Sequence, residues 1–190
     1  MNVVRKRPPS HLTVAEFLAW DSGDRSGRLW QLQDGVPTAM APASDAHAAI
    51  QGELGALIRN HLLATGRPCR VLMNPGVVPR LRAGDNVRIP DLAVNCAASG
   101  AAAPVLLIEI LSPSNARETW ANVWAYATIP SVVEILVLSS TAIAADLLRR
   151  DPGGGWPEQP DHVEGTATLD LHSIGLGLAL AEAYRTAELA

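Results

Sequence analysis

Two acidic residues interrupt apolar stretches that otherwise have the composition of buried strands. Asp91 lies in "RIPDLAVNC", and Glu109 lies in "PVLLIEIL". Burying an ionised carboxylate is costly, so each acid must reach a cation, a hydrogen-bond donor or water, or become protonated. Carboxylates on neighbouring strands are also ligands for Mg²⁺ or Mn²⁺, with a backbone carbonyl and water. The residues alone leave two interpretations open: a divalent-cation site, or unrelated acids, one paired with Arg88 or Arg117 and one exposed at a strand end.

The segments around the acids have the pattern of a β-α-β crossover. Strands are expected over five segments rich in apolar residues, at residues 69–73, 76–82, 91–96, 104–111 and 133–138. Between the last two, Ser114 or Asn115 can cap a helix that runs to about Ala127, since Pro130 cannot continue a helix. A helix between two buried strands implies that the strands pair in parallel through a right-handed connection.

Elements on either side complete the predicted fold. Thr13, with a glutamate three residues later, predicts a short capped helix, and the Asp34-Gly35 pair predicts a hairpin. Ser44 and Gly66 bracket the longest expected helix, and antiparallel strands and a weak helix near residues 179–187 follow the crossover. The pattern predicts an α/β fold with a central mixed sheet flanked by helices. We expect a single domain over residues 11–190, after a tail at residues 1–10.

Composition favours an ordinary globular protein without a membrane segment. Charged residues make up 18% of the 190 residues and hydrophobic ones 48%. No segment reaches the roughly 18 consecutive apolar residues that would cross a bilayer, and the basic start lacks the apolar core of a secretory signal. Cys69 and Cys96 form no C-x-x-C pair. We therefore expect two buried thiols and a cytoplasmic protein.

Charge is unevenly distributed along the chain. The net charge is −4, yet the segment 67–90 carries five arginines against one acid, at Arg67, Arg70, Arg80, Arg82 and Arg88 against Asp85. This segment is either a solvated face or a patch that faces phosphate groups. Trp120 and Trp124 share one face of the crossover helix, where packing against the sheet is favoured over stacking on bases.

The chain resembles a known family in its motif order. A helix, a hairpin and a His-bearing helix precede "RIPDLAV", "IEILSPS" and "WAYATIPSVVEILV". This order resembles the Uma-type family of restriction endonucleases, in the PD-(D/E)XK nuclease superfamily. The resemblance implies a restriction-endonuclease-like fold and a Mg²⁺-dependent or Mn²⁺-dependent endonuclease that hydrolyses nucleic-acid phosphodiesters, DNA above all. By the same resemblance, Asp91 and Glu109 hold the metal ion, with the backbone carbonyl of Ile110 as a third ligand.

The sequence departs from the family pattern at two positions of the expected site. Leu111 stands where the superfamily has a lysine, and Asn122 stands close to where the family moves that lysine onto the following helix. Gln31 replaces an acid expected in the hairpin, and Lys6 lies too far towards the N-terminus to substitute. Arg117 could stabilise negative charge but could not act as a base. Cap chemistry in the first helical turn is the alternative role for this arginine.

His47 opens the long helix, and Gln51 lies one turn further along the same face. The family often carries a histidine here, which implies a position lining the site. The alternative is a histidine that makes only hydrogen bonds within the fold.

Two functions are compatible with these observations. The first is a metal-dependent endonuclease with catalysis impaired by the missing lysine, and the second is a catalytically silent binding or scaffold protein with a nuclease fold. Since many nucleases cut as pairs, a homodimer is also expected.

Overall fold

The computed structural model of the chain describes residues 9–97 and 103–189. Its backbone divides into a first unit, Met1–Pro42 with Gly76–Ile89, and a second unit, Ala43–Pro75 with Pro90–Ala190. Each unit is described by itself below. The expectation of a single domain over residues 11–190 is not tested by this division and stays a prediction.

The first unit contains the expected short helix and hairpin. These elements are α1 (Val14–Ala19), β1 (Trp30–Gln33) and β2 (Val36–Ala39). Thr13 caps α1 in a capping box, in which the Thr13 amide donates to Glu16 Oε2 at 2.8 Å. Asp34 and Gly35 turn the hairpin with φ angles of 48° and 82°, which explains why this Asp-Gly pair predicted the turn. Both predictions are confirmed.

The predicted strand over residues 76–82 is wrong. Val77 pairs with Arg88 in an isolated bridge, and residues 81–85 form turns. Pro79 lacks an amide hydrogen and interrupts any ladder at this point, which the apolar composition of the segment does not reveal.

The arginine-rich segment 67–90 is divided between the two units. In the first unit, Arg82 pairs with Asp34 at 3.1 Å, and the Arg88 guanidinium donates to Asn86 Oδ1 at 3.0 Å. The Arg82 and Asp34 side chains are 62% and 58% exposed, so this pair agrees with a solvated face rather than a desolvated anion site.

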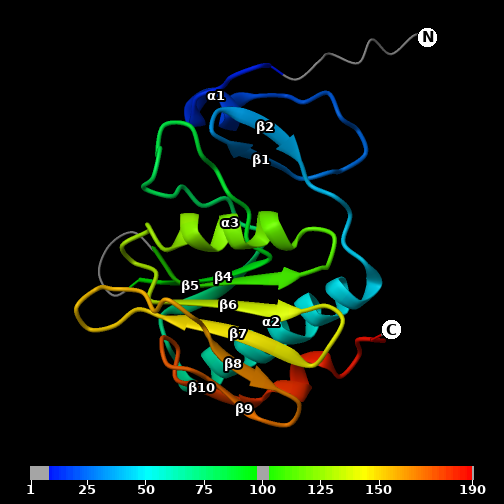
Figure 1. The fold of residues 1–190 in the computed structure, drawn as a ribbon, viewed down its shortest axis with the longest axis vertical. Helices are drawn as coiled ribbons and strands as arrows, with labels where there is room; N and C mark the ends of the chain where they lie inside the picture. Colours follow the sequence, from blue (N-terminus) through cyan, green and yellow to red (C-terminus); the bar gives the residue numbers. More distant parts are fainter. Residues whose placement is uncertain (1–8, 98–102, 190) are drawn as a thin grey trace. The chain divides into compact units, whose positions relative to one another are not determined.

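The second unit is built on a six-stranded mixed sheet (Figure 1). Its elements are α2 (Asp45–Thr65), β3 (Cys69–Met73), β4 (Leu92–Cys96), β5 (Ala103–Leu111), α3 (Ala116–Tyr126), β6 (Glu134–Ser139), β7 (Ala144–Arg149), β8 (Asp161–Glu164), β9 (Thr168–Leu171), β10 (Leu176–Ala179) and the 3₁₀ helix η1 (Leu180–Tyr184). The strand order is β3-β4-β5-β6-β7-β8, with parallel pairing between β5 and β6 and antiparallel pairing elsewhere. The α/β fold class and the parallel crossover are both confirmed.

Helix α2 is the longest helix, as predicted. The Ser44 hydroxyl accepts from the His47 amide at 3.3 Å, and Gly66 ends the helix with a φ of 63°. One face of α2 packs with alternate residues of the central strands and with η1 in the main apolar core, which includes Ile50, Leu54, Ile58, Leu92, Ile108 and Leu136. Figure 1 shows α3 on the opposite face of the sheet from α2.

Helix α3 presents a different face to the sheet from the one expected. Its buried residues are Thr119, Asn122, Val123 and Tyr126, whereas Trp124 is 48% exposed. The expectation that Trp120 and Trp124 pack against the sheet is therefore wrong for Trp124. Apolar character alone favoured the tryptophans, but the face that meets the sheet includes the polar residues that contact Glu109.

Arg150 braces the loop that connects α3 to β6. Its guanidinium donates to the carbonyl oxygens of Ala127 and Ile129, both at 3.0 Å, and to that of Val132 at 2.9 Å. The Trp156 ring covers the guanidinium with its centroid 4.7 Å away. The Ala127 carbonyl also accepts from the Trp156 indole and the Ile129 carbonyl from the Val132 amide, so Arg150 adds a charged donor to a loop whose carbonyls are partly paired already.

We expect Arg150→Met to lower the free energy of unfolding by about 2–4 kcal/mol, because it removes the charged hydrogen bonds to this loop and leaves the Val132 carbonyl without a donor among the described residues. Urea unfolding measures the change. Arg185→Met, at an exposed arginine of the same unit, is the matched control and should change stability little. Equal stabilities of the two variants would show that water replaces Arg150 at no cost.

The cysteines form a disulfide between β3 and β4. Cys69 and Cys96 lie directly opposite each other in the strand register, 27 residues apart in sequence. Both are only half-buried, so the expectation of two buried thiols is wrong. The spacing of the cysteines did not reveal that their strands would be neighbours. The cytoplasmic location, which rested partly on free thiols, stays a prediction.

Within residues 9–97 and 103–189, no helix has the length and apolar character needed to cross a membrane.

Candidate functional site

The register of β4 and β5 brings the two strand acids together. Leu92 lies opposite Ile108, and the same antiparallel register continued by one residue places Asp91 opposite Glu109. Asp91 Oδ2 accepts a hydrogen bond from the Ile110 amide at 2.7 Å, which fixes the end of β4 to β5. The acids are 7% and 6% exposed, so both carboxylates are withdrawn from water.

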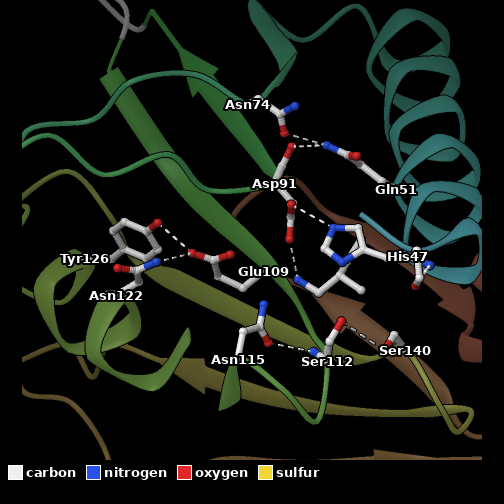
Figure 2. Close-up of polar contacts among 12 residues, drawn as sticks. His47, Gln51, Asn74, Asp91, Glu109, Ser112, Asn115, Asn122, Tyr126 and Ser140 are labelled. Carbon is white, nitrogen blue, oxygen red and sulfur yellow. Dashed lines mark hydrogen bonds and ion pairs between the residues drawn. The ribbon is translucent and has the colours of Figure 1, made fainter. Parts of the chain in front are cut away.

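Helix α2 supplies the partners of Asp91 (Figure 2). His47 Nε2 lies 2.9 Å from Asp91 Oδ1, and both side chains are 10% exposed. One turn along α2, Gln51 donates to the Asp91 carbonyl at 2.8 Å and to Asn74 Oδ1 at 2.7 Å. The contact agrees with a histidine that is hydrogen-bonded within the fold, and the role of His47 in lining a metal site stays a prediction.

Helix α3 supplies the partners of Glu109. The Tyr126 hydroxyl donates to Glu109 Oε1 at 2.7 Å, and the Asn122 amide donates to the same oxygen at 3.3 Å. Asn122 and Tyr126 are one helical turn apart, and both are buried. Within the described part of the chain, Glu109 Oε2 accepts no hydrogen bond.

The environment of Glu109 opposes its negative charge. Burial raises the pKa of the Glu109 carboxyl well above its usual value of 4.5, and the nearby charge of Asp91 raises it further. The hydrogen bonds from Tyr126 and Asn122 favour the ionised form and partly oppose this rise. A cation between the two acids would remove the unfavourable charge, so the electrostatics suit a site for a positive ligand.

The donor set fits a hard divalent cation that keeps several of its waters. Mg²⁺ is commonly bound by one or two carboxylates, with water and other oxygens completing its coordination. Among residues 9–97 and 103–189, no three or more His, Cys, Asp or Glu side chains are grouped to hold a metal ion. Asp91 and Glu109 would therefore share an ion with oxygens from the backbone and from water.

The structure places the other predicted site residues in different surroundings. Asn122 and His47 are brought to the acids, whereas Arg117 is exposed in the first turn of α3 and forms no ion pair with a described residue. Gln31 is buried on β1, in the first unit, and its part in the site stays a prediction, as does the role of the Ile110 carbonyl. Lys6 lies outside the described residues.

Sequence reasoning missed Tyr126 and Asn74 as members of the site. The signal for Tyr126 was its spacing of one helical turn from Asn122, the position where the missing lysine was expected. For Asn74, which follows β3 with a φ of 48°, the sequence carried no signal, since its contact depends on how β3 pairs with β4.

Comparison with known proteins decides the family. The model of the Uma2 family, described as "Putative restriction endonuclease", matches residues 14–183. The chain belongs to the Uma2 family. The resemblance drawn from "RIPDLAV" and "IEILSPS" is thereby confirmed, and it extends over nearly the whole chain.

Two relatives cover almost the same length as this Uma2 chain. The "Uncharacterized protein slr1290" of Synechocystis sp. (strain ATCC 27184 / PCC 6803 / Kazusa) is 29% identical over 185 residues, which are 94% of each chain. A crystal structure from Anabaena variabilis ATCC 29413, described as a putative nuclease belonging to DUF820, superposes with a TM-score of 0.69. The two chains are 18% identical, and the match covers 92% of this chain and 98% of the Anabaena chain. This structural similarity confirms the nuclease-like fold.

Proposed function

We propose that this Uma2-family chain is a divalent-metal-dependent nuclease that hydrolyses phosphodiester bonds in nucleic acid. The observation that carries the proposal is the pair of buried acids on neighbouring strands, Asp91 and Glu109, with one Glu109 oxygen unbonded within the described chain. Family membership supports the reaction class, and the burial and mutual repulsion of the acids support a cation between them.

The chain's own residues would hold and orient the ligands. Asp91 and Glu109 would bind Mg²⁺ or Mn²⁺ together with the Ile110 carbonyl, and the ion would lower the pKa of a bound water and stabilise charge on the phosphate. His47 holds one oxygen of Asp91, and the Ile110 amide holds the other. Withdrawal of both acids from bulk water strengthens every electrostatic contact made there.

The absent lysine implies slow catalysis. Loss of a group that orients water or stabilises developing charge lowers rates by about 10²-fold to 10⁴-fold. Asn122 lies close to where the family's lysine is expected, but it donates a neutral hydrogen bond to Glu109. We therefore propose an enzyme of reduced rather than full activity.

The first test is removal of each acid. We expect Asp91→Ala and Glu109→Ala to abolish both Mn²⁺ binding, measured by calorimetry, and Mn²⁺-dependent cleavage of DNA or RNA. Asp146→Ala is a matched control, since Asp146 also contacts a histidine, His162, at 2.7 Å, but on the exposed surface of β7 and β8. That variant should retain both properties.

Two results would contradict the proposal. The first is Mn²⁺ binding of unchanged affinity in both acid variants, which would place the ion elsewhere. The second is cleavage that persists without metal in the double variant, which would identify a contaminating nuclease.

A second candidate function has an observation in its favour. Among the described residues, the basic side chain that contacts these acids is His47, and neither a lysine nor an arginine pairs with Asp91 or Glu109. A catalytically silent protein that binds nucleic acid or acts as a scaffold would have this property. Mn²⁺ binding without detectable cleavage at high enzyme concentration would favour it over the nuclease.

The partner and assembly also remain proposals. We propose DNA as the nucleic acid on the strength of the family description, and a homodimer as the active form. Sedimentation of the protein with and without duplex DNA distinguishes a monomer, a dimer and a complex.

A further inference from the structure

We propose that Tyr126 is a positioning residue for the candidate metal centre, and that its hydroxyl holds Glu109 Oε1 so that Oε2 remains directed towards a shared divalent cation. This inference rests on the proposed function. It assigns to Tyr126 a role that the sequence motifs of the site did not indicate.

The geometry gives Tyr126 the stronger hold on Glu109. Its hydroxyl lies 2.7 Å from Oε1, against 3.3 Å for the Asn122 amide. Tyr126 is 0% exposed, so its ring is enclosed by the protein and has little room to move. A phenol on a rigid helix has few conformations to lose, and the hydrogen bond therefore orients the carboxylate at little entropic cost.

Both donors contact the same oxygen of Glu109, so the two carboxylate oxygens have different roles. Oε1 is occupied by α3, and Oε2 accepts no hydrogen bond within the described residues (Figure 2). Tyrosine and asparagine are neutral donors, so they orient Glu109 without neutralising the charge that attracts a cation.

Asp91 is held differently, with one contact on each of its carboxylate oxygens. His47 contacts its Oδ1, and the Ile110 amide contacts its Oδ2. Asp91 is thus held from α2 and β5, whereas Glu109 is held from α3. Partners of this kind, one step removed from the metal, typically contribute about 10-fold to 100-fold to metal affinity.

The alternative is that the Tyr126 hydroxyl serves folding alone. In that case its loss would reduce stability, as any buried hydrogen bond does, and would leave the affinity for a cation unchanged. The two roles therefore differ in a measurement of metal binding on the folded protein.

The experiment compares Tyr126→Phe with Tyr184→Phe. Tyr184 is also buried, and its hydroxyl also donates hydrogen bonds, to the Ser139 and Ala144 carbonyls at 3.0 and 2.8 Å, but away from the two acids. Calorimetric titration with Mn²⁺ should show affinity about 10-fold to 100-fold weaker in Tyr126→Phe, and unchanged affinity in Tyr184→Phe. Circular dichroism and urea unfolding establish that both variants are folded.

The outcomes separate this inference from the proposed function. If the wild-type protein binds Mn²⁺, Glu109→Ala loses it and Tyr126→Phe keeps full affinity, the positioning role is overturned and the metal centre stands. If Glu109→Ala binds Mn²⁺ as tightly as wild type, or if the wild-type protein binds none, the proposed centre fails and the role of Tyr126 fails with it.

Discussion

Replacing Asn122 with lysine should raise the rate of metal-dependent phosphodiester cleavage by about 10²-fold to 10⁴-fold. Asn122 faces Glu109 from α3 and donates to its Oε1, so a lysine at this position would place an ammonium group beside the candidate metal ligands. The ammonium would orient the attacking water or stabilise charge on the phosphate, which the neutral amide of asparagine cannot do. On this view, the wild-type site lacks one positively charged side chain.

A charge-matched control separates this effect from general attraction of nucleic acid. Ala121 is the neighbouring residue of α3 and is exposed, so Ala121→Lys adds the same charge outside the site. Cleavage by both variants is measured under single-turnover conditions at fixed salt, because phosphate contacts are strongly salt-dependent. Equal increases in cleavage rate in the two lysine variants would indicate tighter DNA binding alone. If neither variant cleaves faster than wild type, Asn122 does not stand where the missing lysine would act.

The dependence of the Asn122→Lys gain on the acids is a further control. Adding Glu109→Ala to Asn122→Lys should return cleavage to background, because the lysine would then stand beside an absent ligand. Retained activity in this double variant would mean that the new lysine acts without the proposed centre.

Glu109→Gln should make the metal-free protein more stable while it removes metal binding. The pKa of Glu109 is raised in the folded state, so above the ordinary value of 4.5 the unfolded chain gives up its proton more readily than the folded chain. Rising pH therefore destabilises the metal-free folded protein until Glu109 is ionised in both states. Glutamine keeps the oxygen that accepts from Tyr126 and Asn122 and carries no charge.

The size of the stability difference between Glu109→Gln and wild type should depend on pH, and metal should reduce or reverse it. In EDTA at pH 8, we expect Glu109→Gln to unfold at higher urea, with a gain of about 1–3 kcal/mol, and the gain should fade as the pH approaches 4.5. With Mn²⁺ at a hundredfold excess over its Kd, the wild type is stabilised by about 2.7 kcal/mol. The difference in stability between Glu109→Gln and wild type then becomes smaller or changes sign. Glu158→Gln, at an exposed glutamate, is the control and should show neither effect. A Glu109→Gln variant less stable than wild type in EDTA would contradict the cost assigned to the buried charge.

Local signals in the sequence predicted most of the elements that build the site. Thr13, Ser44 and Gly66 mark helix ends through short-range hydrogen bonds and backbone conformation, and such effects depend on neighbouring residues alone. The two apolar runs with their acids predicted β4 and β5 for the same reason. Proximity of Asp91 and Glu109 followed from the resemblance and agrees with the strand register.

Features that depend on long-range pairing escaped prediction. The disulfide requires Cys69 and Cys96 to meet in the register of β3 and β4, and no spacing rule provides that register. The contact of Tyr126 with Glu109 required the rotation of α3 on the sheet, which the tryptophans on that helix suggested wrongly. Segment 76–82 looked like a strand by composition, although no partner strand was available for it among the described residues.

The bond between Cys69 and Cys96 also makes part of the polypeptide a covalent ring. That ring contains residues 76–89, the second of the two stretches that the chain contributes to the first unit, and it contains Asp91 as well. A protease that cuts one peptide bond within the ring opens it without producing two separate molecules, because the sulfur atoms still join the pieces. The stretch at residues 76–89 is therefore a tethered insertion, and a cut in this stretch leaves β3 and β4 covalently attached to each other.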